Sequence, residues 1–132
     1  MFVANDIMKT NLITVNRKAS IYEAIRTLVE KNITGLPVLN DDGTIAGIIS
    51  EKDMLELLYN IDDKPGSVEK FMTEQVVTFK TTDSLTDIAD CFNKNNFRRV
   101  LILKDEKLVG IISRKDIIQY ILSIRQENKV NA

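Results

Sequence analysis

Hydrophobic and polar positions along the chain change their spacing at regular points. Residues 12–15 alternate like a short strand, and beyond Ser20 the apolar residues recur at intervals of three and four. The first pattern predicts a strand and the second a helix that buries one face. We expect the core face of this helix to hold Ile21, Ala24, Ile25, Leu28 and Val29.

Two apolar runs follow this helix, at residues 36–39 and 44–49. Residues 40–43 between them have the composition of a hairpin turn. A calcium loop would need six or more oxygen ligands, so we interpret Asp41 and Asp42 as turn residues. An amphipathic segment starts at Met54, and the predicted order is therefore strand, helix, strand, strand, helix.

The same pattern occurs a second time. Residues 7–58 align with residues 71–121. The offset is 64 residues up to the hairpin turn and 63 beyond it, because the turn of the second copy is one residue shorter. Self-similarity of this kind predicts a duplicated structural unit. We expect one repeat at 1–60, a polar linker at 61–67, a second repeat at 68–127 and a frayed tail at 128–132. Identical positions include Met8 and Met72, Thr14 and Thr78, Ser20 and Ser84, and Gly47 and Gly110.

A motif of seven residues is the clearest part of the duplication. Gly47-Ile-Ile-Ser50-x-x-Asp53 recurs as Gly110-Ile-Ile-Ser113-x-x-Asp116. Each copy predicts a strand that feeds a helix N-terminus, where free N–H groups suit an anion. Ionised aspartates could accept hydrogen bonds from sugar hydroxyls. The same spacing is also a capping box that needs no ligand, and both interpretations stay open.

Composition narrows the classes of function. The chain has 132 residues, 44% of them hydrophobic, and its net charge is -1 with basic and acidic residues interspersed. The chain therefore has no concentrated positive charge of the kind that binds nucleic acid. It also has no apolar run of the roughly 18 residues that a membrane span needs. Without histidine, and with Cys91 as the only cysteine, we expect no enzyme, no metal site and no disulfide. We predict a cytoplasmic protein.

With both copies laid out, the chain resembles a tandem pair of cystathionine-beta-synthase (CBS) domains, a Bateman module. The resemblance covers nearly the whole sequence and rests on the doubled motif, on Thr14 and Thr78, and on residues 36–38 and 97–100. It implies an α/β (α+β) fold of two β-α-β-β-α repeats packed about a pseudo-twofold axis. It also implies two clefts that accept adenosine-containing ligands such as AMP, ADP, ATP or S-adenosylmethionine.

The resemblance also assigns roles to residues. Aspartates 53 and 116 would hold the ribose hydroxyls, the serines of the doubled motif would lie near phosphate, and both threonines with their apolar neighbours would frame adenine. Leu101 stands where the first copy has Pro37, and Thr34-Gly35 stands where the second has Arg98-Arg99, so the two clefts need not bind phosphate equally. The expected ligand-binding residues are Ile13, Thr14, Val15, Gly35, Leu36, Pro37, Ser50, Asp53, Val77, Thr78, Phe79, Arg98, Arg99, Ser113 and Asp116.

Three functions follow from these expectations. The first is a stand-alone regulatory module that binds an adenosyl ligand, requires no cofactor and modulates a separate effector protein. The second is a structural association module with empty clefts that acts through homo-oligomerisation. The third is an enzyme, which no nucleophile–base pair in the sequence supports. The family resemblance also suggests a homodimer.

Overall fold

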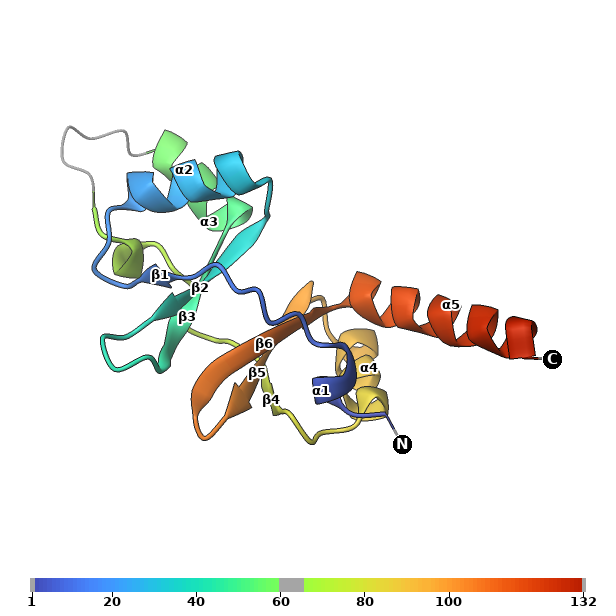
Figure 1. The fold of residues 1–132 in the computed structure, drawn as a ribbon. Helices are drawn as coiled ribbons and strands as arrows, with labels where there is room; N and C mark the ends of the chain where they lie inside the picture. The colour runs from blue at the N-terminus through green and yellow to red at the C-terminus, as the bar shows by residue number, and fades with distance from the viewer. Residues whose placement is uncertain (1, 60–65, 132) are drawn as a thin grey trace. The chain divides into compact units, whose positions relative to one another are not determined.

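The computed structural model describes residues 2–59 and 66–131, with side chains as far as residue 126. The chain forms two compact units, each with its own three-stranded sheet (Figure 1). The first-sheet unit comprises Ile13–Val76, and the second-sheet unit comprises Met1–Leu12 together with Val77–Ala132. The predicted linker at 61–67 falls mostly on residues 61–65, which lie outside the described residues.

The first-sheet unit has the predicted order of elements. Strands β1 (Val15–Asn16), β2 (Gly35–Leu39) and β3 (Ile45–Ser50) form a sheet in which β2 is central, parallel to β1 and antiparallel to β3. Helix α2 (Ile21–Lys31) joins the first two strands. The single-turn helices α3 (Glu51–Leu55), η1 (Glu56–Leu58) and η2 (Val68–Lys70) follow β3.

The second-sheet unit repeats this topology. Its sheet consists of β4 (Thr78–Lys80), β5 (Arg99–Lys104) and β6 (Lys107–Ser113), again with the middle strand parallel to the first and antiparallel to the third. Helix α4 (Leu85–Lys94) joins β4 to β5, and α5 (Arg114–Asn131) follows β6. Helix α1 (Ala4–Ile7), from the start of the chain, contacts α5 and β6 in this unit (Figure 1).

Two predictions about single elements were wrong. The strand expected at 12–15 begins only at Val15 and ends at Asn16, and Leu12 belongs to the other unit. Val29 is 74% exposed, since eight residues rotate a helix by about 80° and carry this side chain away from Ile21. Helix α5 is assigned as far as Asn131, which includes most of the tail at 128–132.

The helix capping that the sequence predicts is present. The Ser20 hydroxyl accepts a hydrogen bond from Tyr22 N at 3.2 Å, and that of Ser84 accepts one from Asp87 N at 3.1 Å. At the other end of α2, Asn32 adopts the left-handed conformation with φ 53°, which an asparagine tolerates better than most residues. These contacts fix where the helices begin and end.

Both hairpin turns hold the residues expected of them. Asn40 N donates to Thr44 O at 2.8 Å, and the Asp42 carboxylate accepts a bond from Thr44 N at 3.0 Å. Hydrogen bonds from Asn16 and Lys18 lower the pKa of Asp41 below its ordinary value. The second turn carries Asp105 and Glu106 at positive φ, as a tight two-residue hairpin requires. Asp41 and Asp42 therefore serve the turn.

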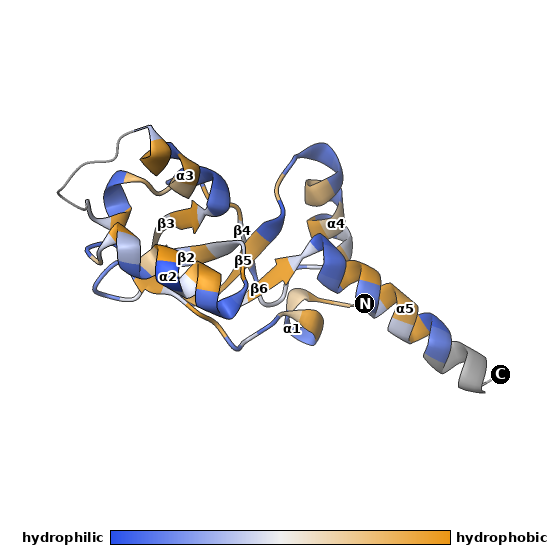
Figure 2. Ribbon diagram, turned by 90° about the horizontal axis from the view of Figure 1, so that it is seen from above, coloured by the Kyte–Doolittle hydropathy of each residue, from blue (hydrophilic) through white to orange (hydrophobic). Residues whose placement is uncertain are grey.

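Each unit contains its own hydrophobic core between its sheet and its helices. Ile21, Leu36, Val38 and Ile49 are fully buried in the first-sheet unit. Ile88, Val100, Ile102 and Ile112 are fully buried in the second-sheet unit. Figure 2 shows hydrophobic stretches along the strands and a mixture of hydrophobic and hydrophilic residues along α5. Among residues 2–59 and 66–131, no helix has both the length and the apolar character needed to cross a membrane.

The boundaries of the two units differ from those of the sequence repeats. Ala4, near the start of the first repeat, is buried in the core of the second-sheet unit, with Met8 packed against it. Val68 and Met72, which occupy the same two places in the second repeat, pack into the core of the first-sheet unit. The opening segments of the repeats are thus exchanged. Each unit is completed by about ten residues from the other repeat.

Candidate functional site

The doubled motif forms a strand-to-helix junction in each unit. In the first-sheet unit Ser50 ends β3 and caps α3. Its N–H and hydroxyl donate to Asp53 Oδ2 at 2.9 and 3.1 Å, and Asp53 N donates weakly to the Ser50 hydroxyl at 3.5 Å. The capping box predicted as an alternative is therefore present, and it engages one carboxylate oxygen of Asp53.

The second-sheet unit has the equivalent junction between β6 and α5. Ser113 N donates to Asp116 Oδ2 at 2.8 Å, and Asp116 N donates to the Ser113 hydroxyl at 3.2 Å. Asp116 is only 8% exposed and is the one charged residue that is buried among those the structure describes. A charge at such a position needs a partner close by.

The second oxygen of each aspartate has a different partner in the two units. Asp53 Oδ1 accepts a hydrogen bond from the Thr73 hydroxyl at 3.1 Å. Asp116 Oδ1 lies 3.3 Å from the ammonium nitrogen of Lys9. Lys9 and Thr73 follow the aligned residues Met8 and Met72, so they occupy equivalent positions in the two repeats. One junction is therefore completed by a neutral hydroxyl and the other by a positive charge.

Backbone hydrogen bonds hold these partners against the sheet edges. Ile48 and Thr73 exchange two bonds, of 2.9 and 2.8 Å, and Ile111 and Lys9 exchange two of 3.0 and 2.9 Å. Strands β3 and β6 are thus each covered on their outer edge, which would otherwise expose unpaired polar groups. The exchanged segments therefore place a side chain beside each aspartate.

The remaining predicted residues of the first-sheet unit divide into exposed and buried ones. Gly35 pairs directly with Ser50 across β2 and β3, so it lies beside the junction. Thr14 is exposed and Ile13 half-buried. Leu36 and Pro37 are fully buried, and Leu36 and Val15 belong to the core. In this structure the side chains of these buried residues form part of the sheet beneath the junction.

In the second-sheet unit one of the two arginines lies beside the junction. Arg99 begins β5 and pairs directly with Ser113, which puts both side chains on one face of the sheet. Arg98 precedes the strand and is exposed. Thr78 is exposed at the start of β4, with Val77 and Phe79 half-buried on either side.

Lys9 and Thr73 were missed in the sequence, although they contact the aspartates that the sequence singled out. Both lie far from those aspartates along the chain and in the opposite repeat. The sequence did show that each of them directly follows one of the aligned residues Met8 and Met72. Only the exchange of segments, which residue spacing does not reveal, brings them to the site.

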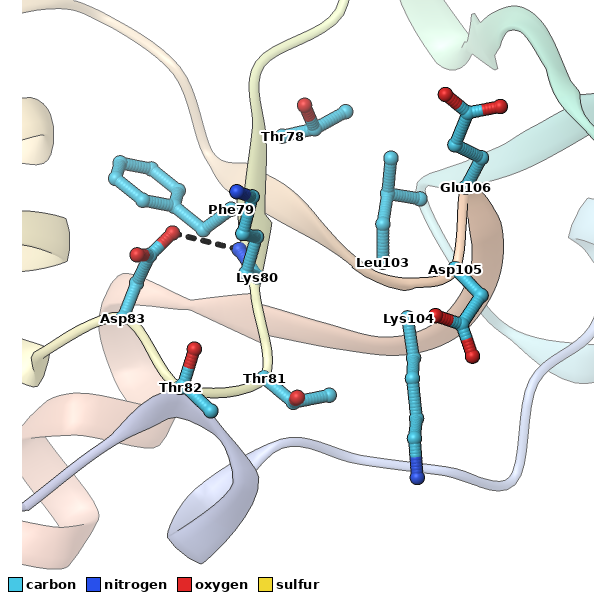
Figure 3. A pocket seen from close by; sticks show the side chains of 10 residues that line it. All are labelled: Thr78, Phe79, Lys80, Thr81, Thr82, Asp83, Leu103, Lys104, Asp105 and Glu106. Carbon is cyan, nitrogen blue, oxygen red and sulfur yellow. Dashed lines mark hydrogen bonds between the residues drawn. The ribbon is translucent and has the colours of Figure 1, made fainter.

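A separate hollow of about 560 Å³ lies in the second-sheet unit, where β4 ends beside the second hairpin turn (Figure 3). Within it, the Asp83 carboxylate accepts a hydrogen bond of 2.6 Å from Lys80 N. In the first-sheet unit the equivalent place holds Arg17, which donates to Glu69 and Asn40 at 2.7 Å each. Only Thr78 and Phe79 of the predicted site line the hollow, so it is distinct from the junction at Asp116.

Comparison with known families identifies the sequence repeats. The model of the CBS domain matches the chain twice, at residues 3–60 and 68–123. These two ranges agree with the repeats seen in the sequence, while the compact units exchange their opening segments.

Relatives of known sequence include three archaeal proteins. The chain is 33% identical to MJ1225 and 36% identical to MJ1232 of Methanocaldococcus jannaschii, over 86% and 87% of its length. It spans only 41% and 38% of those two proteins. It is also 33% identical to a 17.7 kDa protein of Acidianus ambivalens, over 91% of the chain and 73% of that protein.

Two similar solved structures contain adenosine derivatives. The complex of CBSX2 with AMP superimposes with a TM-score of 0.86 at 29% identity, covering 95% of this chain and 99% of that one. CBSX2 is a protein of Arabidopsis thaliana. The domain pair of MJ0100, in complex with 5′-methylthioadenosine and S-adenosyl-L-methionine, superimposes with a TM-score of 0.80 at 27% identity, covering 93% and 98%.

Proposed function

Because the chain belongs to the CBS domain family and carries two such domains in tandem, we propose that it is a regulatory module that binds an adenosine-containing ligand. The observation that carries this proposal is the pair of strand-to-helix junctions, each with a serine and an aspartate held in one geometry. The AMP complex of CBSX2 and the S-adenosyl-L-methionine complex of the MJ0100 pair support the same class of ligand.

Each junction offers acceptors that suit the two hydroxyls of a ribose. An ionised carboxylate accepts several hydrogen bonds, and Asp53 Oδ1, which accepts one from the Thr73 hydroxyl, has capacity for more. Exposed Thr14 and Thr78, at the first strands, would flank the adenine, while Ser50 and Ser113 would lie near phosphate. The ligands to consider are AMP, ADP, ATP and S-adenosylmethionine.

Binding of such a ligand should raise the melting temperature of the protein. A ligand that binds only the folded chain adds about 2.7 kcal/mol of apparent stability at 100 times its dissociation constant. Thermal unfolding with AMP, ADP, ATP, S-adenosylmethionine and NAD is the measurement. No shift with any of them at millimolar concentration would favour an association module with empty sites.

Arg99 should contribute to phosphate binding, because it shares a sheet face with Ser113. Arginine binds phosphate through charge-assisted and often bidentate hydrogen bonds. Arg99→Ala should therefore weaken AMP binding by about 1.5–3 kcal/mol and leave adenosine binding nearly unchanged. Calorimetry measures both affinities.

Arg98→Ala is the matched control for this prediction, since Arg98 is the exposed neighbour that precedes the strand. It should leave both affinities unchanged. Equal losses for AMP and adenosine in Arg99→Ala, or a larger loss of AMP binding in Arg98→Ala, would place the phosphate contact elsewhere.

We further propose that the module works as a homodimer and modulates a separate effector protein in the cytoplasm. Exposed apolar side chains support an association surface: Ile118, Ile121 and Leu122 of α5 are 65%, 60% and 56% exposed and fall on one helix face. The mass of the protein in solution tests the dimer. A ligand-dependent change in that mass would link binding to association.

We do not propose catalysis. In the parts of the chain that the structure describes, no three His, Cys, Asp or Glu side chains gather where they could hold a metal ion. Cys91 is half-buried, and its sulfur has a long contact of 3.9 Å with the side-chain amide of Asn95. A turnover assay with adenine nucleotides is the direct test.

A further inference from the structure

The ion pair between Lys9 and Asp116 distinguishes one aspartate site from the other. The Asp116 side chain is 7% exposed, whereas that of Lys9 is 69% exposed, so a buried carboxylate meets a solvated ammonium at 3.3 Å. The exposed ammonium can be rearranged at little cost because water solvates it, whereas the buried carboxylate keeps its need for hydrogen-bond donors. In the other unit, the equivalent contact is the neutral hydroxyl of Thr73 on Asp53.

Resting on the proposed function above, we infer that Lys9 sets the charge preference of the Asp116 site. This site selects adenosine 5′-phosphates and disfavours S-adenosylmethionine, whose 5′ sulfur is a cation. The Asp53 site, with Thr73 in place of the lysine, lacks this preference. The chain therefore contains one site tuned to nucleotides and one that tolerates either ligand.

The preference follows from what happens to the ammonium when a ribose binds. The sugar hydroxyls compete with Lys9 for Asp116 Oδ1, so the ammonium must share its counterion. A phosphate on the 5′ carbon of the same sugar replaces that counterion, because the four-carbon stem of lysine reaches several ångströms in any direction. A sulfonium at that place repels the ammonium, and a neutral nucleoside gives it no new partner.

The surroundings of Lys9 leave it room to turn. Lys9 and Asp116 line an open hollow of about 280 Å³ bordered by residues of α1 and α5. The backbone of Lys9 is held by its two hydrogen bonds to Ile111, so the side chain moves about a fixed point. The ammonium can therefore leave Asp116 without disturbing the sheet edge.

Calorimetry with AMP, adenosine and S-adenosylmethionine tests this inference on the full chain. The experiment is done in an Asp53→Asn background, which weakens ligand binding at the Asp53 site. Affinities at the Asp116 site are then measured with Lys9 present and with Lys9→Thr. The ratio of AMP affinity to S-adenosylmethionine affinity should fall by about five- to tenfold in Lys9→Thr, the effect of one unit charge near a solvated site. Adenosine should bind as well as before or better.

The reciprocal change and a matched control complete the experiment. Thr73→Lys in an Asp116→Asn background should raise the same ratio at the Asp53 site. Lys18→Thr removes a lysine of equal exposure, 69%, whose partner Asp41 is in a hairpin turn. It should change no affinity.

The outcomes separate the two proposals. An unchanged ratio in Lys9→Thr, or an equal loss for all three ligands, overturns the role of Lys9 while the adenosine site stands. Failure of all three ligands to bind the unmodified protein overturns the proposed function and this inference with it.

Discussion

Gly47→Ala should lower the free energy of unfolding toward the upper end of about 1–3 kcal/mol, the usual cost of adding a methyl group where there is no room. A Cβ at this position would lie 2.5 Å from the backbone oxygen of Thr73 and 3.1 Å from the sulfur of Met72. Chemical denaturation measures the loss. An alanine at this position must push the exchanged segment away from β3.

The expected loss is large because the obstructing atom belongs to the backbone. The same Thr73 oxygen accepts the hydrogen bond from Ile48 N at 2.9 Å, so moving it also strains the contact that covers the sheet edge. A displaced Thr73 would carry its hydroxyl away from Asp53. Gly47→Ala should therefore also disturb ligand binding at the first junction.

Gly110→Ala provides the comparison within the same molecule. There the added Cβ meets the Met8 side chain, at 2.5 Å from the sulfur and 2.8 Å from Cγ. Met8→Ala should recover part of the stability lost in Gly110→Ala, because it removes the sulfur and Cγ and leaves only the Cβ of residue 8, at 2.9 Å. Met72→Ala should recover little in Gly47→Ala. Equal recovery in both double variants would contradict the backbone collision with Thr73.

The sequence predicted the topology of the units because each repeat carries complete local signals. The helix-period stripe after Ser20, the composition of residues 40–43 and the capping spacing at Ser50 act over a few residues, and neighbours in sequence satisfy them. Because the second repeat carries the same pattern, the same elements were predicted for it. Those predictions were confirmed wherever local geometry decides the element.

The exchange of the opening segments could not be predicted in this way. Ala4 and Met8 pack into one core and Val68 and Met72 into the other, with the two methionines beside Gly110 and Gly47 respectively. A duplicated sequence satisfies its pattern equally well whether each segment packs on its own repeat or on the other. Only the three-dimensional contacts decide between these two arrangements.

The candidate site was predicted to the extent that it is local. Ser50 and Asp53, like Ser113 and Asp116, lie three residues apart, and their mutual hydrogen bonds follow from that spacing. The partners of the second carboxylate oxygens lie in the exchanged segments and were missed. The burial of Leu36 and Pro37 could not be predicted either, since a short apolar run does not show which of its residues a ligand can reach.

Asp53→Asn and Asp116→Asn should each weaken adenosine-ligand binding by about 1.5–3 kcal/mol, roughly the value of a hydrogen bond to a charged group. Each change replaces an ionised acceptor by a neutral amide of nearly the same shape. Stability should fall by less than about 1 kcal/mol, because asparagine can still accept the bond from the serine N–H. Calorimetry of the double variant should detect no binding in the concentration range that saturates the unmodified protein.

Ser20→Ala separates a lost contact from a weakened fold. Its hydroxyl caps α2 through Tyr22 N and belongs to no predicted ligand site, so the substitution should cost about 1 kcal/mol of stability and leave affinity unchanged. The aspartate variants are expected to do the reverse. If Ser20→Ala weakened binding as much as Asp53→Asn does, the aspartates would act by supporting the fold, and their assignment to the ribose would be wrong.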